Sequence, residues 1–277
     1  MKGLLAVFDN HFHLRQDGLF LEAVRRFQKE GGTCINLTNL PNYALPAEGY
    51  YTRIYEETIQ MAKIIRRSTP VKVIVTLGPY PLDYFFFRDS GMDPLGKMQN
   101  GLEVLRPYLQ SGEAVAIGEV GRPHFQVSEK EYEDGTRIIQ ESMVLARDEG
   151  CPVVLHTEDL KCGDLEKLGD AARRIGLRQE MVVKHHSDPE NLSCNVRILH
   201  SILATRTNVR KASESARDFL LESDYVDDPL KPGKVIAPES VPRRAKMIMQ
   251  ENDDWERILH ASFVDLPGKL YGIERIA

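Results

Sequence analysis

The stretch Val7-Phe8-Asp9-Asn10-His11-Phe12-His13, close to the N-terminus, indicates both the fold and the chemistry of this chain. The segment 4–8 is apolar, which predicts a buried strand that runs into a polar end. Because side chains alternate across a strand, Asp9, His11 and His13 are expected on one side of it. Two residues of rise separate the two histidines by roughly 6.6 Å, so both imidazoles can reach one cation.

The composition is that of an ordinary globular protein. Of the 277 residues, 42% are hydrophobic and 28% are charged, and the net charge is −5. This charge gives no overall attraction for nucleic acid, so such binding would need a local basic patch. No apolar run approaches the roughly 20 residues that span a bilayer, and the segment 1–8 is too short for a signal peptide. We therefore expect a cytoplasmic protein with no membrane contact and no stable protein partner.

The four cysteines give no sign of a structural role. Cys34, Cys151, Cys162 and Cys194 are scattered along the chain and include no C-x-x-C pair. Neither a disulfide framework nor a thiolate zinc site is indicated, and reduced cysteines are expected.

Strand and helix patterns alternate along the whole chain. After the first strand, we expect strands at 33–37, 71–77, 114–119, 152–156, 181–185, 202–205 and 219–221. We expect helices at 19–29, 50–67, 95–109, 128–149, 164–175, 192–199, 209–216 and from 242 onward, with a loop at 78–93. Ser128 and Glu131 form a capping-box pattern at the start of the helix 128–149. Eight strand–helix units without a composition break predict an α/β fold, a single (β/α)8 TIM barrel over residues 1–277, in preference to a doubly wound open sheet.

Five of the expected strands end in side chains that could bind a metal ion. In a barrel these ends meet on one face, where active sites of this fold lie. Each residue alone has a structural explanation, such as a turn-forming aspartate or a core histidine. Together they favour a metal site at the carboxyl ends of the strands. The candidates are His11 and His13 after the first strand, Glu119 after the fourth, His156 after the fifth, His185 or His186 after the sixth, and Asp224 after the eighth.

Between the two adjacent histidines, His185 is the preferred ligand. The segment 182–185 repeats the pattern of 153–156, an apolar strand followed by a histidine, and adjacent strand residues cannot both face inward. Lys184 would then point to the helix layer, with its amine reaching toward solvent. Glu222 falls on the same face as Asp224 and is expected to support the ligands.

This donor set fits hydrolytic chemistry. Imidazole and carboxylate ligands without thiolate suit Zn²⁺, Mn²⁺ or Fe²⁺, and Mg²⁺ less well, so one or two divalent ions are expected. Two such ions can lower the pKa of a shared water and stabilise the attacking and leaving oxygens. Asp224 could take the proton of that water and return it to the leaving group.

The motifs resemble those of the TatD-like metal-dependent hydrolases of the amidohydrolase superfamily. The matching segments are 9–13, 118–121, His156, His185, 222–224 and the C-terminal 267–272. The resemblance implies a binuclear site in which His11 and His13 hold one ion, His156 and His185 hold the other, Glu119 bridges, and Asp224 binds the first ion and handles the proton.

The resemblance also implies an activity. It favours a phosphodiesterase of the TatD deoxyribonuclease kind, with DNA as substrate. The alternatives are an amide, ester or lactone hydrolase for a small molecule, and a binding protein that keeps the metal for structure. The last is disfavoured because structural sites close their coordination, whereas this set leaves room for water.

Three departures from the family pattern bear on the substrate. The family's Gly-x-His-Pro is replaced by the segment 78–81, which carries Tyr80. The family's arginine after His156 is replaced by two acids at 158–159, and Leu-Asp after Gly121 by Arg122 and Pro123. We expect Tyr80 and Arg122 to contact the substrate, with Arg122 holding a phosphate oxygen. The alternative is that Arg122 pairs with one of the two acids and only shapes the pocket. The aromatic block 84–87 could stack a base, but packing of the loop under its own side chains is the preferred explanation.

Overall fold

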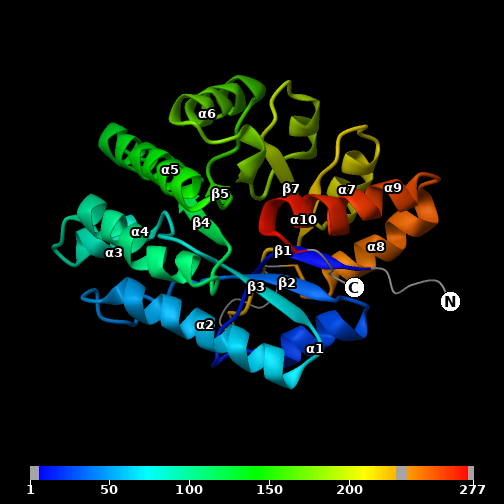
Figure 1. The fold of residues 1–277 in the computed structure, drawn as a ribbon, viewed down its shortest axis with the longest axis horizontal. Helices are drawn as coiled ribbons and strands as arrows, with labels where there is room; N and C mark the ends of the chain where they lie inside the picture. Colours follow the sequence, from blue (N-terminus) through cyan, green and yellow to red (C-terminus); the bar gives the residue numbers. More distant parts are fainter. Residues whose placement is uncertain (1–5, 229–235, 274–277) are drawn as a thin grey trace.

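The computed structural model describes residues 6–228 and 236–273. Within these residues, nine parallel strands form one sheet in the order β8-β7-β6-β5-β4-β3-β2-β1-β9 (Figure 1). The strands are β1 (Phe8–His13), β2 (Cys34–Thr38), β3 (Lys72–Leu77), β4 (Ala116–Gly121), β5 (Val153–His156), β6 (Val182–Lys184), β7 (Leu199–Leu203), β8 (Leu220–Glu222) and β9 (Tyr225–Val226).

The two ends of this sheet meet and close a barrel. β8 pairs with β7, while β9 pairs with β1 through Phe12 and His13. Only Ser223 and Asp224 separate β8 from β9, so the two are one eighth strand with a break, at which Asp224 takes a φ of 46°. The Asp9 carboxylate lies in this break, where its Oδ1 accepts hydrogen bonds from the backbone N–H of Ser223 at 2.9 Å and of His11 at 3.3 Å. The predicted TIM-barrel architecture is confirmed.

Helices follow the strands and cover the outside of the barrel (Figure 1). Their apolar stripes pack on strands that are buried on both faces, the pattern expected of a parallel sheet. The capping box of α5 is formed as predicted, with Ser128 and Glu131 bonded reciprocally. The α-helices are α1 (Leu21–Lys29), α2 (Tyr50–Ser68), α3 (Asp83–Asp89), α4 (Pro94–Gln110), α5 (Glu129–Glu149), α6 (Cys162–Ile175), α7 (Arg206–Ser213), α8 (Ser240–Glu251), α9 (Trp255–His260) and α10 (Leu266–Tyr271). Shorter turns are η1 (Gln179–Met181), η2 (Pro189–Ser193) and the π-helical η3 (Ala261–Asp265).

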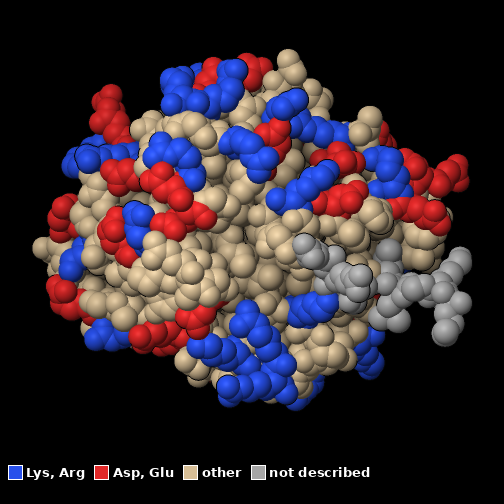
Figure 2. Space-filling model, viewed as in Figure 1, with Lys and Arg blue, Asp and Glu red and all other residues tan. Residues whose placement is uncertain are grey.

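The C-terminal helix α10 packs at the start of β1. Its Tyr271 ring lies 5.9 Å from the ring of Phe8, and its hydroxyl donates to Asn10 Oδ1 at 2.7 Å. On the side of the molecule that Figure 2 shows, Lys and Arg side chains gather over the C-terminal end of α2, and charges of both signs are interspersed elsewhere. No helix of the described residues is long and apolar enough to cross a membrane.

Several predicted boundaries are wrong. The first strand is Phe8–His13 and not 4–8, of which residues 4 and 5 lie outside the described residues. The segment 78–93 contains the helix α3 and is not all loop.

The helix expected at 192–199 is also wrong, because η2 and the start of β7 occupy this region. The backbone is extended from Cys194, whose φ is −70° and ψ 139°. The guanidinium of Arg217 supports this course, because it donates to the carbonyls of the alternate residues Cys194 at 2.7 Å, Ile198 at 3.1 Å and Val196. The sixth unit therefore has a short turn in place of a helix.

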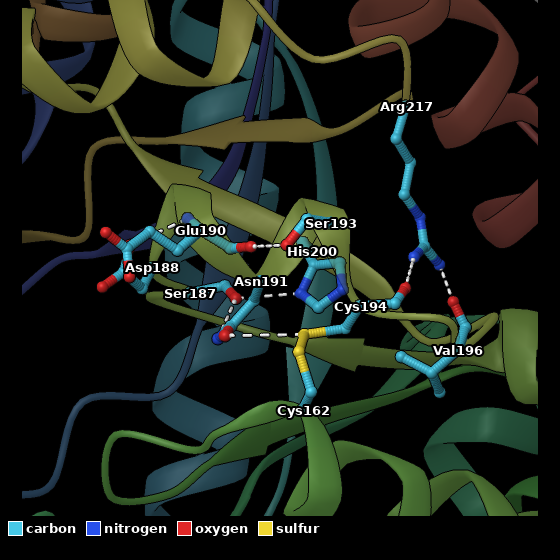
Figure 3. The surroundings of a disulfide bond; sticks show 10 residues. All are labelled: Cys162, Ser187, Asp188, Glu190, Asn191, Ser193, Cys194, Val196, His200 and Arg217. Atoms are coloured by element: carbon cyan, nitrogen blue, oxygen red, sulfur yellow. Dashed lines mark hydrogen bonds between the residues drawn. A yellow bond between two sulfur atoms is a disulfide. The ribbon is translucent and has the colours of Figure 1, made fainter.

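The expectation of reduced cysteines is wrong for one pair. Cys162, the first residue of α6, and Cys194, directly after η2, form a disulfide across 32 residues of sequence (Figure 3). Their Cα atoms lie 5.2 Å apart, within the usual range for a disulfide. The bond ties the segment after β5 to the segment after β6. Cys34 and Cys151 are free and buried.

Candidate metal centre

The end of β1 brings His11 and His13 together. Their Nε2 atoms lie 3.0 Å apart, a separation that one cation could bridge with bonds of about 2.0–2.1 Å. The Nδ1 of His13 is 3.1 Å from the carbonyl oxygen of Thr38. Because a carbonyl only accepts, this Nδ1 carries the proton, and the Nε2 lone pair is left to face the cluster.

Glu119, at the end of β4, lies between two pairs of histidines. Its Oε1 is 3.3 Å from His13 Nε2 and 3.7 Å from His11 Nε2. Its Oε2 is 2.7 Å from His156 Nδ1 and 3.2 Å from His185 Nε2. One buried carboxylate thus faces all four imidazoles, each oxygen toward one pair, which is the geometry that a bridging ligand requires.

Asp224 lies next to His11 and His13 and forms a group of three with them. Its Oδ1 lies 3.6 Å from His13 Nε2, and its side chain keeps 24% of its surface exposed. The break between β8 and β9 places this carboxylate at the open side of the cluster, within reach of water. The structure therefore brings all six predicted ligands together. Among the described residues, three groups of three could each hold an ion, with their ligand atoms within 4.8 Å of one another. Two of them divide these six residues, namely His11, His13 and Asp224, and Glu119, His156 and His185, and the third is His11, His185 and Glu222.

The structure separates the two adjacent histidines clearly. His185 is 1% exposed and stacks on His11 with ring centroids 4.2 Å apart. The side chain of His186 is 54% exposed, and its Nδ1 lies 3.8 Å from Asp224 Oδ2. Glu222 Oε1 is 3.1 Å from His185 Nδ1 and accepts from the His186 backbone N–H at 2.6 Å. Glu222 therefore orients the ring of His185, the supporting position expected from the sequence.

The charges of the cluster depend on one another. Burial alone would raise the pKa of Glu119, but the neighbouring His156 and His185 outweigh it and hold that pKa well below its usual range. Burial likewise opposes the charge on Glu222, yet His185 lowers its pKa to about 2. The pKa of His185 is correspondingly raised well above its usual value, because Glu222 and Glu119 outweigh its burial. Without an ion, a proton on His185 offsets the buried carboxylates, and a cation could take the place of that proton.

Lys184 differs from the prediction. Its amine was expected to reach solvent, but the residue is only 3% exposed. Nζ donates to the carbonyl oxygen of His185 at 2.7 Å and lies 3.5 Å from that of Thr157. Burial lowers the pKa of this amine, although Glu222 and other carboxylates nearby oppose the shift. The strand is too short and too well covered for the amine to escape, so it binds the backbone of two segments that carry the site.

Tyr80 lies beside the cluster. Its ring packs edge-on against the ring of His156, with centroids 5.3 Å apart. Its backbone N–H donates to the buried carboxylate of Asp83 at 3.0 Å, which fixes the loop after β3.

Arg122 is engaged within the protein. Its Nε and Nη2 donate to the two oxygens of Glu158 at 3.0 and 2.7 Å, and Nη1 donates to Thr136 at 3.2 Å. The guanidinium also lies over the ring of Tyr132 at 4.5 Å, and the residue is 5% exposed. This geometry matches the alternative in which Arg122 pairs with an acid and shapes the pocket. Its contact with substrate stays a prediction.

Sequence reasoning missed Asp9 as part of the site's support. Burial raises its pKa to about 8, and its Oδ1 holds the backbone of both ends of the barrel seam. The only signal in the sequence was its place two residues before His11, where it was grouped with the histidines.

Comparisons with known proteins show the family to which this chain belongs. A sequence profile of the family described as "TatD related DNase" matches residues 8–271. An uncharacterized protein, MJ1127 of Methanocaldococcus jannaschii, is 31% identical over 253 residues, which are 89% of each chain.

Solved structures show the same fold. The TatD-like protein AF1765 of Archaeoglobus fulgidus superposes with a TM-score of 0.65 at 18% identity, over 96% of this chain and 99% of that one. The TatD homolog YjjV of Escherichia coli gives 0.66 at 20% identity, over 97% and 99%. A mutant organophosphorus hydrolase of Deinococcus radiodurans gives 0.62 at 16% identity, over 97% and 93%. The profile match and the relative in M. jannaschii establish that this chain belongs to the TatD related DNase family, with the fold of a metal-dependent hydrolase.

Proposed function

We propose that this protein hydrolyses phosphodiester bonds of single-stranded DNA at a centre of two divalent ions. One observation carries the proposal, the placement of the buried Glu119 carboxylate within 3.7 Å of a ring nitrogen of each of four histidines. Such a carboxylate would be costly to bury without positive partners. In this proposal His11 and His13 would hold one ion, His156 and His185 would hold the other, and Glu119 would be a ligand shared by both.

The residues around the ions have separate tasks. The bound ions would lower the pKa of a water and stabilise negative charge on the reacting phosphate. Asp224, which is partly exposed and 3.6 Å from His13, accepts the proton of the attacking water and returns it to the leaving oxygen. Glu222 holds the ring of His185, and Tyr80 limits access beside His156.

The family of the chain supports the choice of substrate. A profile described as "TatD related DNase" matches residues 8–271, and DNA is the substrate that this description names.

A second candidate is the hydrolysis of a neutral ester or lactone. It is favoured by the state of the two cationic side chains near the centre. The guanidinium of Arg122 is bound by Glu158, and the amine of Lys184 is bound by backbone carbonyls. Neither side chain, as placed here, offers a charge to a phosphate.

Rates on DNA and on neutral substrates separate these candidates. Purified protein loaded with Mg²⁺, Mn²⁺ or Zn²⁺ should cleave a single-stranded oligonucleotide, and should do so faster than it cleaves a panel of esters and lactones. Absence of metal-dependent DNA cleavage would contradict the nuclease proposal and leave the hydrolase class standing.

Replacing Arg122 sharpens the result. If Arg122 leaves Glu158 to hold a phosphate oxygen, Arg122→Ala should lower kcat/KM on DNA by about tenfold to a hundredfold, or about 1.4–2.7 kcal/mol, and leave neutral substrates unaffected. If it only shapes the pocket, both substrate types should suffer together. Arg137→Ala is the matched control, because Arg137 forms an exposed pair with Glu141 on α5.

A further inference from the structure

A series of aromatic rings leads away from the candidate metal centre at His156. Tyr80 and His124 both contact the His156 ring, with centroid distances of 5.3 and 5.8 Å. Phe125 follows His124 at 5.7 Å, and Phe85 follows Phe125 at 5.8 Å. We call these four residues, Tyr80, His124, Phe125 and Phe85, the aromatic rim. They come from the loops and helix after β3 and from the loop after β4.

The outer part of the aromatic rim is exposed. Phe125 keeps 47% of its surface accessible and His124 is also exposed, while Tyr80 and Phe85 are half-buried. A phenyl ring on a loop gains little for folding when half of it remains in water. Single exposed apolar residues are common on proteins, but this one lies two ring contacts from a candidate metal ligand.

The loop that carries His124 and Phe125 is anchored to the site. The backbone N–H of Arg122 donates to the carbonyl oxygen of His156 at 2.9 Å, and the Arg122 side chain is tied to Glu158 on the same segment as His156. Pro123 follows and is buried. The two aromatic residues therefore start from a position fixed relative to His156.

The aromatic rim offers ring faces and little free charge. The cation that lies over it is Arg88, 5.0 Å from the centre of the Phe85 ring, and Arg88 also binds Asp89 and Glu131. A surface of this kind suits a flat, uncharged aromatic group, which gains from ring contacts and needs no matching charge.

We propose that the aromatic rim is a subsite for a nucleobase adjacent to the scissile bond. The proposal rests on the proposed function for the position of that bond, and it names the part of the substrate that the metal centre does not hold. Every base has a π-face, so stacking on Phe125 and His124 would be tolerant of sequence, as on other single-strand binding surfaces. The competing explanation is that the four rings pack only against one another.

Matched substrates distinguish these explanations. Thymidine 5′-(p-nitrophenyl phosphate) and methyl p-nitrophenyl phosphate share a leaving group and a charge and differ in the nucleoside. Phe125→Ala should lower kcat/KM for the thymidine ester by roughly five- to a hundredfold and change that for the methyl ester by less than about twofold. Phe125→Trp should keep kcat/KM for the thymidine ester close to that of the wild type. Met249→Ala, which truncates a side chain 43% exposed on α8, is the control and should change neither. Equal effects of Phe125→Ala on both esters, or none on the thymidine ester, would overturn the subsite.

An equilibrium titration keeps the subsite testable if the enzyme cleaves neither ester, a result that would count against the proposed function alone. Metal-loaded protein that is otherwise wild type, with and without Phe125→Ala, would be titrated by calorimetry with a thymidine tetranucleotide and with its abasic counterpart. Tighter binding of the thymidine chain that is lost with Phe125→Ala supports the subsite. Equal affinity for the two chains contradicts it.

Discussion

Two buried histidines, His185 directly after β6 and His200 on β7, have pKa values that are shifted in opposite directions by their surroundings. β6 and β7 pair so that Lys184 is opposite His200, and both histidines are at most 1% exposed. Glu222 and Glu119 outweigh the burial of His185 and raise its pKa well above the usual value. Burial, with Arg217 and Lys184 nearby, lowers the pKa of His200 to about 3.

The surroundings of His200 are built for structure. Its Nδ1 is 2.9 Å from the Ser187 hydroxyl, which also accepts from Asn191 at 3.4 Å, and the disulfide of Cys194 lies beside them (Figure 3). None of the groups in the described residues that could hold an ion includes His200. The comparison teaches that burial alone does not distinguish a candidate metal ligand from a structural histidine. The carboxylates of Glu222 and Glu119 face His185 and make the difference.

The largest expected effect concerns Asp224. Asp224→Asn should lower turnover by about a thousandfold or more, because an amide cannot accept the proton of water and is a poorer ligand than a carboxylate. Circular dichroism should show an unchanged fold. Activity within threefold of the parent on the best substrate would show that Asp224 has no such role.

The two histidines themselves provide a matched pair. His185→Ala should lower the metal content and the activity together. The variant lacks a proposed ligand, and the negative charge of Glu222 loses its imidazole partner. His200→Ala should keep the metal content, measured by elemental analysis of purified protein, and lose only stability. Equal loss of metal in both variants would break the comparison.

The disulfide should affect stability and not chemistry. Replacing Cys162 and Cys194 by alanine releases a closed segment of 32 residues, for which chain entropy predicts a loss of about 3–4 kcal/mol in the free energy of unfolding. Urea unfolding measures this loss, and Cys151→Ala, at a free buried cysteine, is the control. A variant without the disulfide that unfolds at the same urea concentration as the parent would refute a stabilising role.

The depressed pKa of His200 should contribute to the pH dependence of the free energy of unfolding. Because its folded pKa is depressed to about 3, the unfolded chain binds a proton below pH 6.5 that the folded chain does not. Its contribution to stability is complete above pH 6.5 and falls as the pH drops toward 3, by about 1.4 kcal/mol per unit. His200→Asn should therefore lose about 2 kcal/mol less than the parent between pH 7 and pH 5 in urea unfolding. Identical losses would contradict the assignment.

The sequence was sufficient for features that repeat with a period or end a strand. The alternation of strands and helices predicted the barrel, and His156 and His185 could be placed at strand ends because each follows an apolar run. The bond between Cys162 and Cys194 could not be predicted, because only the folded barrel brings the two segments together. The burial of the Lys184 amine was not predicted. The alternation of residues along a strand predicts which face a side chain lies on, but not how completely other elements cover it.

The central claim is that the cluster around Glu119 binds divalent ions, and a calorimetric titration tests it most directly. Protein stripped with a chelator would be titrated with Zn²⁺ and with Mn²⁺, alongside Glu119→Gln. We predict that the wild type binds up to two ions with release of protons and that Glu119→Gln loses at least one of them. Wild-type protein that is folded and yet binds neither ion, or Glu119→Gln that binds both ions like the wild type, would contradict the claim.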